Sequence, residues 1–169
     1  MIKVTLDNAI LKRISAIDQN KFTVNETKLP VSTANKLRKN SKKKSSYASN
    51  KIEGNPLTEA QADAGNPDYI PPEYTDVPLL LDELVEYVNT TDDHPLIIAA
   101  VVHYQIVTIH PFEDGNGRTA RLMSGYILEL NGYGFNGIGS LDEYYAYDID
   151  EYYNSLQMGL PALYYSGRD

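Results

Sequence analysis

Twelve consecutive residues, HPFEDGNGRTAR (110–121), gather side chains that suit chemistry on phosphate esters. Gly115 and Gly117 let the backbone approach a ligand closely and adopt conformations that other residues avoid. Arg118 and Arg121 fall on one face of the helix that should follow this loop. Guanidinium groups donate paired hydrogen bonds to phosphate, and the free N–H groups of a helix start also favour anions. The stretch therefore predicts a polyphosphate site.

The same stretch carries a carboxylate and an imidazole, which would complete a site for phosphoryl or nucleotidyl transfer. Asp114 offers an oxygen to Mg²⁺, which commonly takes one or two protein carboxylates beside phosphate and water. His110 could accept the proton of an attacking hydroxyl. A structural histidine, an ordinary Gly-Asn-Gly turn and two surface arginines are the alternatives. We favour the site because Arg118 and Arg121 are the only Lys or Arg residues between positions 52 and 167.

Composition excludes several other kinds of site. The 169 residues include no cysteine, which excludes disulfides, zinc–thiolate centres and cysteine nucleophiles. No GxxxxGK[ST] segment is present, so a P-loop is excluded as well. The longest apolar run, 95–102, is too short to span a bilayer, and residues 1–14 lack the apolar core of a signal peptide. We expect one soluble, cytoplasmic domain without a membrane partner.

The net charge of −8 hides a division along the chain. Residues 1–52 carry twelve Lys/Arg and three Asp/Glu, whereas residues 53–169 carry three Lys/Arg and twenty Asp/Glu. Such asymmetry fits either a basic arm for nucleic acid or two halves that pack against each other. The cluster KLRKNSKKK (36–44) has no interleaved aromatic residue, and we predict a solvated loop there. Because an acidic body would repel DNA, we do not expect nucleic acid as a partner.

Apolar periodicity and turn residues predict an all-α domain. We expect helices over 8–17, 77–88, 95–108, 117–130 and 141–158, with shorter helices near 32–38 and over 45–56. The helix over 95–108 is apolar all round, which is typical of a core helix. In the helix after the loop, we expect Ala120, Met123, Ile127 and Leu130 to face inward. Four prolines between residues 55 and 75 predict a loop.

The stretch 110–121 resembles the signature of the Fic family, H-P-F-x-[D/E]-G-N-G-R-x-x-R, at every fixed position. The resemblance implies the Fic fold, a helical bundle whose central helix–loop–helix carries the signature, with room for a small β-hairpin flap. It also implies Mg²⁺-dependent transfer of AMP from ATP to a hydroxyl side chain of a target protein. By position, His110 would deprotonate that hydroxyl and Asp114 would hold Mg²⁺. Asn116 would bind phosphate oxygens, and Phe112 would anchor the loop in the core.

The other signature residues would complete the nucleotide site. The backbone around Gly115 and Gly117 would bind phosphate oxygens, and Arg118 and Arg121 would take the β- and γ-phosphates. Related Doc-type kinases carry lysine in place of Gly117, so the resemblance favours nucleotidyl transfer.

A second element, Ser49-Asn-Lys-Ile-Glu-Gly54, resembles the inhibitory motif [S/T]-x-x-x-E-[G/N] of many Fic proteins. Glu53 would end a short helix, where the helix dipole disfavours a carboxylate by about 0.3–1 kcal/mol. A solvent-facing glutamate is the ordinary interpretation. The alternative is that Glu53 reaches a cation elsewhere, and the acidic part of the chain offers almost only Arg118 and Arg121. The resemblance implies that Glu53 pairs with Arg121, so that the γ-phosphate cannot sit correctly, and that Ser49 supports the helix. In some relatives the same glutamate instead orients a water that removes AMP.

The resemblance leaves several points open. Tyr152 and Tyr153 fall where relatives line the adenine pocket, although an aromatic core explains them equally well. We interpret His103 as a structural residue of its helix, and His94, next to Pro95 at a helix start, as a surface or capping residue. In relatives, a longer segment at this place includes a flap that docks the target protein. Here the corresponding segment consists only of residues 56–70.

We divide the chain into an N-terminal helix with a basic loop (1–44), an inhibitory helix (45–56) and a catalytic core (57–169), within one compact domain.

Two other functions are alternatives to the adenylyltransferase: a de-adenylylating hydrolase that uses the same site, and a catalytically silent interaction module with the Fic fold. The fourteen tyrosines make self-modification conceivable, and a homo-oligomer also stays open.

Overall fold

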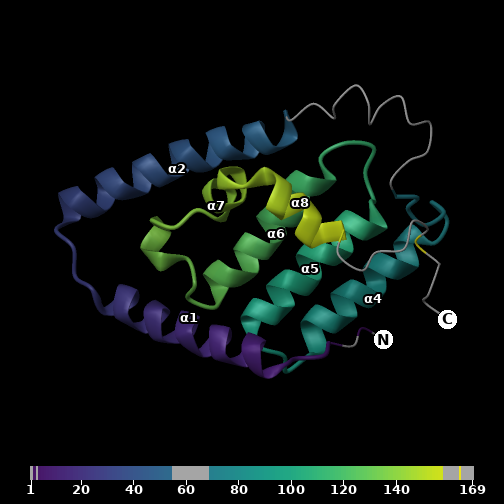
Figure 1. Cartoon of the computed structure of the whole chain (residues 1–169), viewed down its shortest axis with the longest axis horizontal. Helices are drawn as coiled ribbons and strands as arrows, with labels where there is room; N and C mark the ends of the chain where they lie inside the picture. The colour runs from purple at the N-terminus through teal and green to yellow at the C-terminus, as the bar shows by residue number, and fades with distance from the viewer. Residues whose placement is uncertain (1, 3, 55–68, 158–163, 165–169) are drawn as a thin grey trace.

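A computed structural model of the chain describes residues 2, 4–54, 69–157 and 164, and the elements that it contains are helical (Figure 1). They are α1 (Asn8–Glu26), α2 (Val31–Glu53), α4 (Val77–Thr90), α5 (Pro95–Ile109), α6 (Asn116–Leu130), the 3₁₀ turn η1 (Phe135–Gly137), α7 (Leu141–Tyr147) and α8 (Ile149–Gln157). No β-strand occurs in this part of the chain, where Ile70 is a single bridge residue. The all-α prediction is confirmed. The predicted flap segment, 56–70, lies outside the described residues except for its last two positions.

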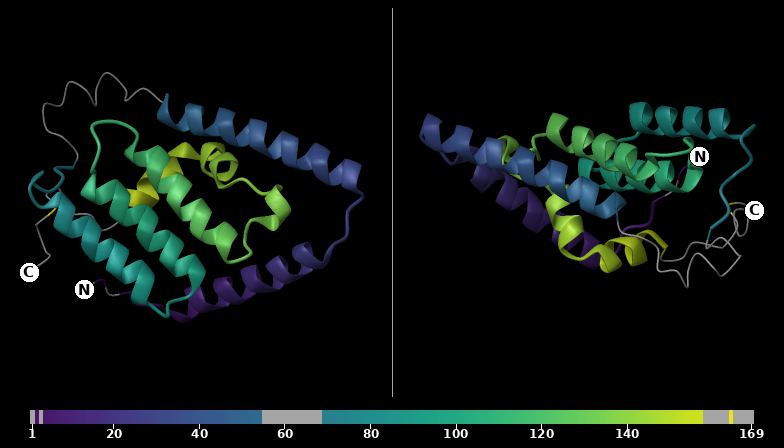
Figure 2. Two further views of the ribbon diagram at one scale, coloured as in Figure 1. Left: turned by 180° about the vertical axis from the view of Figure 1, so that it is seen from behind. Right: turned by 90° about the horizontal axis from the view of Figure 1, so that it is seen from above.

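The centre of the molecule is an antiparallel pair formed by α5 and α6, with α4 against α5 (Figure 2). Pro95 occupies the first position of α5, where its missing N–H costs nothing. The main core cluster joins α4, α5 and α6 through Leu84, Ala99, Val102, Ile106, Ala120 and Ile127. The expected core helix is thus confirmed, and it delivers the chain directly into the loop at 110–115.

The basic segment 36–44 is helical, so the prediction of a solvated loop is wrong. It lies inside α2, which runs without a break through both of the short helices expected near 32–38 and over 45–56. No Gly or Pro interrupts these positions, and lysine is a good helix former. The helix needs few apolar residues because it packs on α7 through one narrow stripe that includes Ser41, Ala48 and Ile52.

Two other helices differ from the prediction at their ends. α1 continues to Glu26 instead of stopping near residue 17, since no helix breaker occurs before Pro30. The helix expected over 141–158 is divided at Asp148, whose Oδ1 accepts a hydrogen bond of 3.0 Å from the N–H of Glu151. This Asp148 contact caps a new helix start.

The inward face of α6 is more polar than expected. Ala120 and Ile127 are buried as predicted, but Met123 and Leu130 are 40% and 67% exposed. Arg121 and Ser124 occupy the buried positions instead. A buried arginine in this place requires counter-charges from other elements.

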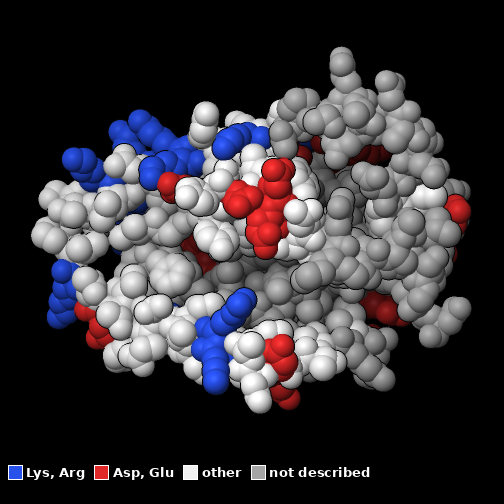
Figure 3. Space-filling view, viewed as in Figure 1, with Lys and Arg blue, Asp and Glu red and all other residues white. Residues whose placement is uncertain are grey.

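Basic side chains are concentrated on α2. Figure 3 shows Lys and Arg side chains gathered over α2. The two halves of the chain nevertheless pack together, because Lys44 of α2 pairs with Glu143 of α7 at 2.6 Å. Among the helices that the structure describes, none is both long and apolar enough to cross a membrane.

Candidate functional site

The signature loop is closed by its own backbone and one amide side chain. His110 ends α5 in the left-handed region (φ 54°), and Gly115 starts α6 with φ 89°, a conformation that favours glycine. The buried side chain of Asn116 bridges the loop: its Oδ1 accepts from the N–H of Phe112 at 2.9 Å, and its Nδ2 donates to the carbonyl of Phe112 at 2.6 Å. These bonds hold the loop open at the start of α6.

The prediction that the Phe112 side chain anchors the loop in the core is wrong. This ring is 50% exposed, and the backbone of Phe112, rather than the ring, ties the loop down. Binding of phosphate oxygens by Asn116 stays a prediction; in this structure its side-chain amide is hydrogen-bonded within the loop.

His110 is exposed and oriented through one ring nitrogen. Its Nδ1 lies 3.2 Å from the carbonyl oxygen of Val107. With the proton on Nδ1, this contact is a hydrogen bond, and the lone pair of Nε2 is directed away from α5. The arrangement fits a histidine that accepts a proton from a group bound over the loop.

Asp114 and Arg118 pair across the loop. Arg118 Nη2 donates to Asp114 Oδ2 at 2.7 Å, and the two side chains are 52% and 83% exposed. No group of three His, Cys, Asp or Glu side chains forms a metal site within the described parts of the chain. One accessible carboxylate fits a Mg²⁺ ion that takes its remaining ligands from phosphate and water, whereas it would not hold a tightly bound resident metal.

Arg121 is buried between three elements. Its side chain is only 3% exposed. Its Nη2 donates to Glu53 Oε1 at 2.7 Å and to Ser49 Oγ at 3.1 Å, both from α2. Its Nε donates to Asp142 Oδ1 at 3.0 Å, from the first turn of α7. The structure therefore brings the two predicted motifs, 49–54 and 110–121, into direct contact.

Gly117 leaves the space in which this contact forms. A Cβ atom placed on Gly117 would lie 2.8 Å from Glu53 Oε1 and 3.2 Å from Arg121 Nη1. A side chain at this position would therefore displace the Glu53 carboxylate.

Arg121, Glu53 and Asp142 form a charged cluster. The pKa values of Arg121 and of the neighbouring His103 are shifted. Burial alone would lower the pKa of Arg121, but its bonds to Glu53 and its contact with Tyr152 outweigh burial and raise that pKa. Burial, reinforced by the Arg121 charge, lowers the pKa of His103 to about 4. The imidazole of His103 is therefore neutral near pH 7, and the positive charge stays on Arg121.

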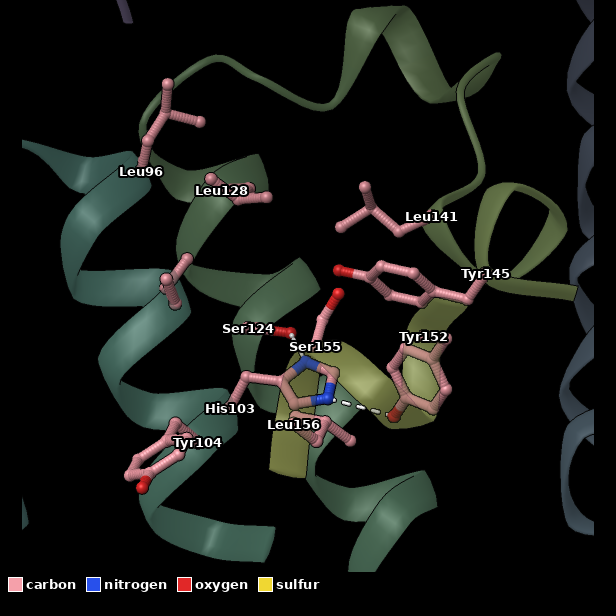
Figure 4. A pocket seen from close by; sticks show the side chains of 12 residues that line it. Leu96, His103, Tyr104, Ser124, Leu128, Leu141, Tyr145, Tyr152, Ser155 and Leu156 are labelled. Carbon is pink, nitrogen blue, oxygen red and sulfur yellow. Dashed lines mark hydrogen bonds between the residues drawn. The ribbon is translucent and has the colours of Figure 1, made fainter. Parts of the chain in front are cut away.

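A pocket of about 470 Å³ lies between α5, α6, α7 and α8 (Figure 4). His103 and Tyr152 line its inner end, where His103 Nε2 and the Tyr152 hydroxyl are 3.0 Å apart. Tyr152 belongs to the core cluster of Ala48, Ile52 and Ala146. The expectation that His103 is structural is confirmed, and Tyr152 packs as the aromatic-core alternative describes.

The remaining predicted residues have simpler surroundings. Tyr153 is 38% exposed, and its hydroxyl donates to the carbonyl of Ile52 at 3.1 Å. An adenine-binding role for either tyrosine stays a prediction. His94 caps α5, since its Nδ1 accepts from the N–H of Leu96 at 3.3 Å. This agrees with the capping role expected for His94.

Sequence reasoning missed Asp142. Ser140 followed three residues later by Glu143 marks a helix start, and Ser140 Oγ does accept from the N–H of Glu143 at 3.1 Å. This cap agrees with the helix start predicted at residue 141, which already placed Asp142 in the first turn of that helix. It carried no information about contact with Arg121, which depends on how α7 docks beside α6.

Known proteins are similar to this chain over the segment that carries both motifs. A sequence model described as the Fic/DOC family matches residues 31–128, which include both motifs. The curated relative named Protein adenylyltransferase Fic from Aedes aegypti is 38% identical over 85 residues, covering 48% of this chain and 17% of that protein. Proteins of the same name from Drosophila melanogaster and Culex quinquefasciatus are 40% and 38% identical, also over 85 residues and with the same coverage. The chain thus matches 17% of the length of these curated relatives.

Proposed function

The chain belongs to the Fic/DOC family, and from this premise we propose that it is a Mg²⁺-dependent protein adenylyltransferase that Glu53 holds inactive. The observation that carries the proposal is the contact between Glu53 and Arg121 at 2.7 Å, made beside a complete signature loop. Similarity to proteins named protein adenylyltransferase supports the same reaction class.

The proposed reaction moves AMP from ATP to a Ser, Thr or Tyr hydroxyl of a target protein. The hydroxyl oxygen bonds to the α-phosphorus while the bond between that phosphorus and the leaving oxygen breaks, and pyrophosphate departs. Nε2 of His110 takes the hydroxyl proton. Asp114 would hold Mg²⁺, which would neutralise phosphate charge when bound.

The two arginines and the loop backbone bind the rest of the nucleotide. Gly115 and Gly117 bring free N–H groups at the start of α6 close to the phosphates, and Asn116 keeps the loop in shape. Arg118 takes the β-phosphate and Arg121 the γ-phosphate, so that both neutralise the charge that develops on pyrophosphate.

Inhibition follows from competition for one guanidinium. Glu53 and a γ-phosphate are both anions, and both require Nη2 of Arg121. While the Glu53 carboxylate occupies that nitrogen, the γ-phosphate is repelled and the triphosphate cannot adopt the orientation needed for transfer. Ser49 adds a second contact that keeps α2 in place.

A second reaction is favoured by the place of Glu53. Its side chain is 31% exposed, and its Oε1 lies beside Gly117 in the first turn of α6, next to the loop. A carboxylate there could orient a water toward an AMP-modified hydroxyl, so a de-adenylylating hydrolase is the alternative activity of the same site.

Transfer of label from ATP carrying ³²P at the α-position, with Mg²⁺ and cell lysate, tests the proposal. Wild type is compared with Glu53→Gly and with Glu53→Gly/His110→Ala. We expect label on protein to rise at least tenfold with Glu53→Gly and to vanish in the double variant. ATP binding to Glu53→Gly without labelling of any protein would contradict the transferase and favour the hydrolase or a catalytically silent module.

A further inference from the structure

Asp142 holds the same guanidinium as Glu53, but through a different nitrogen. Its Oδ1 accepts from Arg121 Nε at 3.0 Å, whereas Glu53 accepts from Nη2. Because the guanidinium is planar, a bond to Nε fixes the plane and the direction of the whole group. The two carboxylates therefore do different things to Arg121: Asp142 fixes its orientation, and Glu53 occupies its outer edge.

The Asp142 carboxylate is itself fixed on both oxygens. While Oδ1 accepts from Arg121, Oδ2 accepts from the hydroxyl of Ser45 at 2.5 Å. Asp142 lies in the first turn of α7, whose start is capped by Ser140. This side chain is only 22% exposed. It is therefore a rigid support that does not depend on Glu53.

The free edge of Arg121 points toward the loop. Nη1 lies 3.2 Å from the position of a Cβ on Gly117, and Nη2 is the nitrogen that Glu53 covers. If the Glu53 carboxylate leaves, one N–H of Nη2 becomes available beside Nη1 on the side of the loop, while Ser49 keeps its hydrogen bond to Nη2 and Nε stays bound to Asp142. A paired set of donors is the arrangement that suits a terminal phosphate.

We propose that Asp142 is the positioning residue of Arg121, which keeps the guanidinium directed at the terminal phosphate once Glu53 has withdrawn. The proposal rests on the proposed function, because it takes Arg121 as the γ-phosphate ligand. Asp142 also remains paired with the buried guanidinium of Arg121 in the active state. Release of Glu53 therefore does not leave the charge of Arg121 buried without a counter-charge.

The test measures the affinities for ATP and AMP by isothermal titration calorimetry with Mg²⁺, in the Glu53→Gly background. AMP lacks the terminal phosphates, so the ratio of the two affinities reports on Arg121 and not on the general condition of the fold. We expect Glu53→Gly to bind ATP at least tenfold more tightly than AMP. Adding Asp142→Ala should reduce this ratio to about twofold while leaving the affinity for AMP unchanged.

Two further variants separate positioning from other effects. Asp142→Asn keeps an acceptor oxygen for Nε and should restore the ratio of the Glu53→Gly protein. Glu143→Gln changes the neighbouring acidic residue of α7, which pairs with Lys44 and does not touch Arg121, and should also keep that ratio. If Asp142→Ala does not give folded protein, Asp142→Ser is used in its place. The serine side chain is polar, but it is too short for its hydroxyl to reach Nε of Arg121.

The outcomes are distinguishable. A Glu53→Gly protein that binds ATP no better than AMP overturns the proposed function, and the role of Asp142 with it. A Glu53→Gly protein that prefers ATP, and keeps that preference after Asp142→Ala, overturns the positioning role alone.

Discussion

The Glu53 carboxylate lies against the α-carbon of Gly117, in the space that any larger residue would need. The end of α2 can therefore reach Arg121 only because position 117 has no side chain. The same glycine that opens the loop to phosphate thus also admits the inhibitory carboxylate, and the two anions compete within one volume.

Gly117→Ala should separate Glu53 from Arg121. The new methyl group would lie 2.8 Å from Glu53 Oε1, and the flexible end of that side chain is the atom most easily displaced. Glu53→Gln should therefore lower the free energy of unfolding by about 1 kcal/mol in the wild type, but by less than about 0.3 kcal/mol in Gly117→Ala. Urea unfolding of the four proteins measures both effects.

Gly125→Ala is the matched control for this experiment. It also lies in α6, and a Cβ there would meet no described heavy atom within 4 Å. It should stabilise the helix by up to about 1 kcal/mol and leave the effect of Glu53→Gln intact. An undiminished effect of Glu53→Gln in Gly117→Ala would show that the carboxylate does not depend on the space at Gly117.

Glu53→Gln and Asp142→Asn should be strongly non-additive. Each change alone leaves Arg121 with one carboxylate and relieves the repulsion between the two, so each should cost no more than about 1 kcal/mol. Together they leave a guanidinium that is 3% exposed without a counter-charge, and the double variant should lose about 1–2 kcal/mol beyond the sum. The measurement is a double-mutant cycle of urea unfolding.

Glu143→Gln provides the comparison for that cycle. Glu143 pairs with Lys44, but both side chains are largely exposed and neither contacts Arg121. Its combination with Glu53→Gln should be additive within about 0.5 kcal/mol. If the effects of Glu53→Gln and Asp142→Asn on the free energy of unfolding were also additive, the buried Arg121 would not require a carboxylate partner for stability.

Local signals in the sequence were sufficient for the central helices and the loop. Pro95, the continuous apolar run after it, and Gly115 and Gly117 define the end of one helix and the start of the next, so the helix–loop–helix could be predicted to within a residue or two. For Glu53, the charge pattern left Arg118 and Arg121 as the candidate distant partners, and only the family resemblance selected Arg121, which lies 68 positions away along the chain.

The parts that could not be predicted depend on packing between helices. The apolar pattern of α6 fits a face with Met123 and Leu130, yet the helix is rotated so that Arg121 and Ser124 lie inside. This rotation is stable because Glu53 and Asp142 supply counter-charges from two other helices. The continuity of α2 was missed for a related reason: its outer face is made of lysines, so it lacks an amphipathic pattern over most of its length.

Tyr133→Phe should loosen α1 without affecting the centre of the molecule. None of the residues of α1 is buried, so the helix depends on polar contacts to the body. The Tyr133 hydroxyl donates a short hydrogen bond to Asp18 of α1 and lies 3.2 Å from His94 Nε2. We expect amide hydrogen exchange in α1 to accelerate about fivefold to tenfold, which corresponds to roughly 1–1.4 kcal/mol.

The exchange experiment carries two internal comparisons. Amides of α5 and α6 should keep their protection, because their packing does not involve this contact. Tyr126→Phe removes a hydroxyl from a ring that is 57% exposed and forms no hydrogen bond within the described part of the chain, and it should leave α1 unchanged. Equal acceleration throughout the protein would mean that α1 does not open as a separate unit.

Stability should fall below about pH 6.5 because of His103. Burial and the neighbouring Arg121 lower the pKa of His103 from 6.5 to about 4, so the folded protein binds this proton less readily than the unfolded chain. The corresponding stability is complete above pH 6.5 and is lost as the pH falls toward 4, by roughly 3 kcal/mol at about 1.4 kcal/mol per pKa unit. His103→Gln, which can still form a hydrogen bond with Tyr152, should remove this part of the pH dependence.

Urea unfolding at pH 7.5 and pH 5 measures the difference in stability. His110→Gln, a change at an exposed histidine, should retain the full loss of stability that the wild type shows. A pH dependence that is the same in His103→Gln and wild type would mean that acid destabilisation comes from the carboxylates alone.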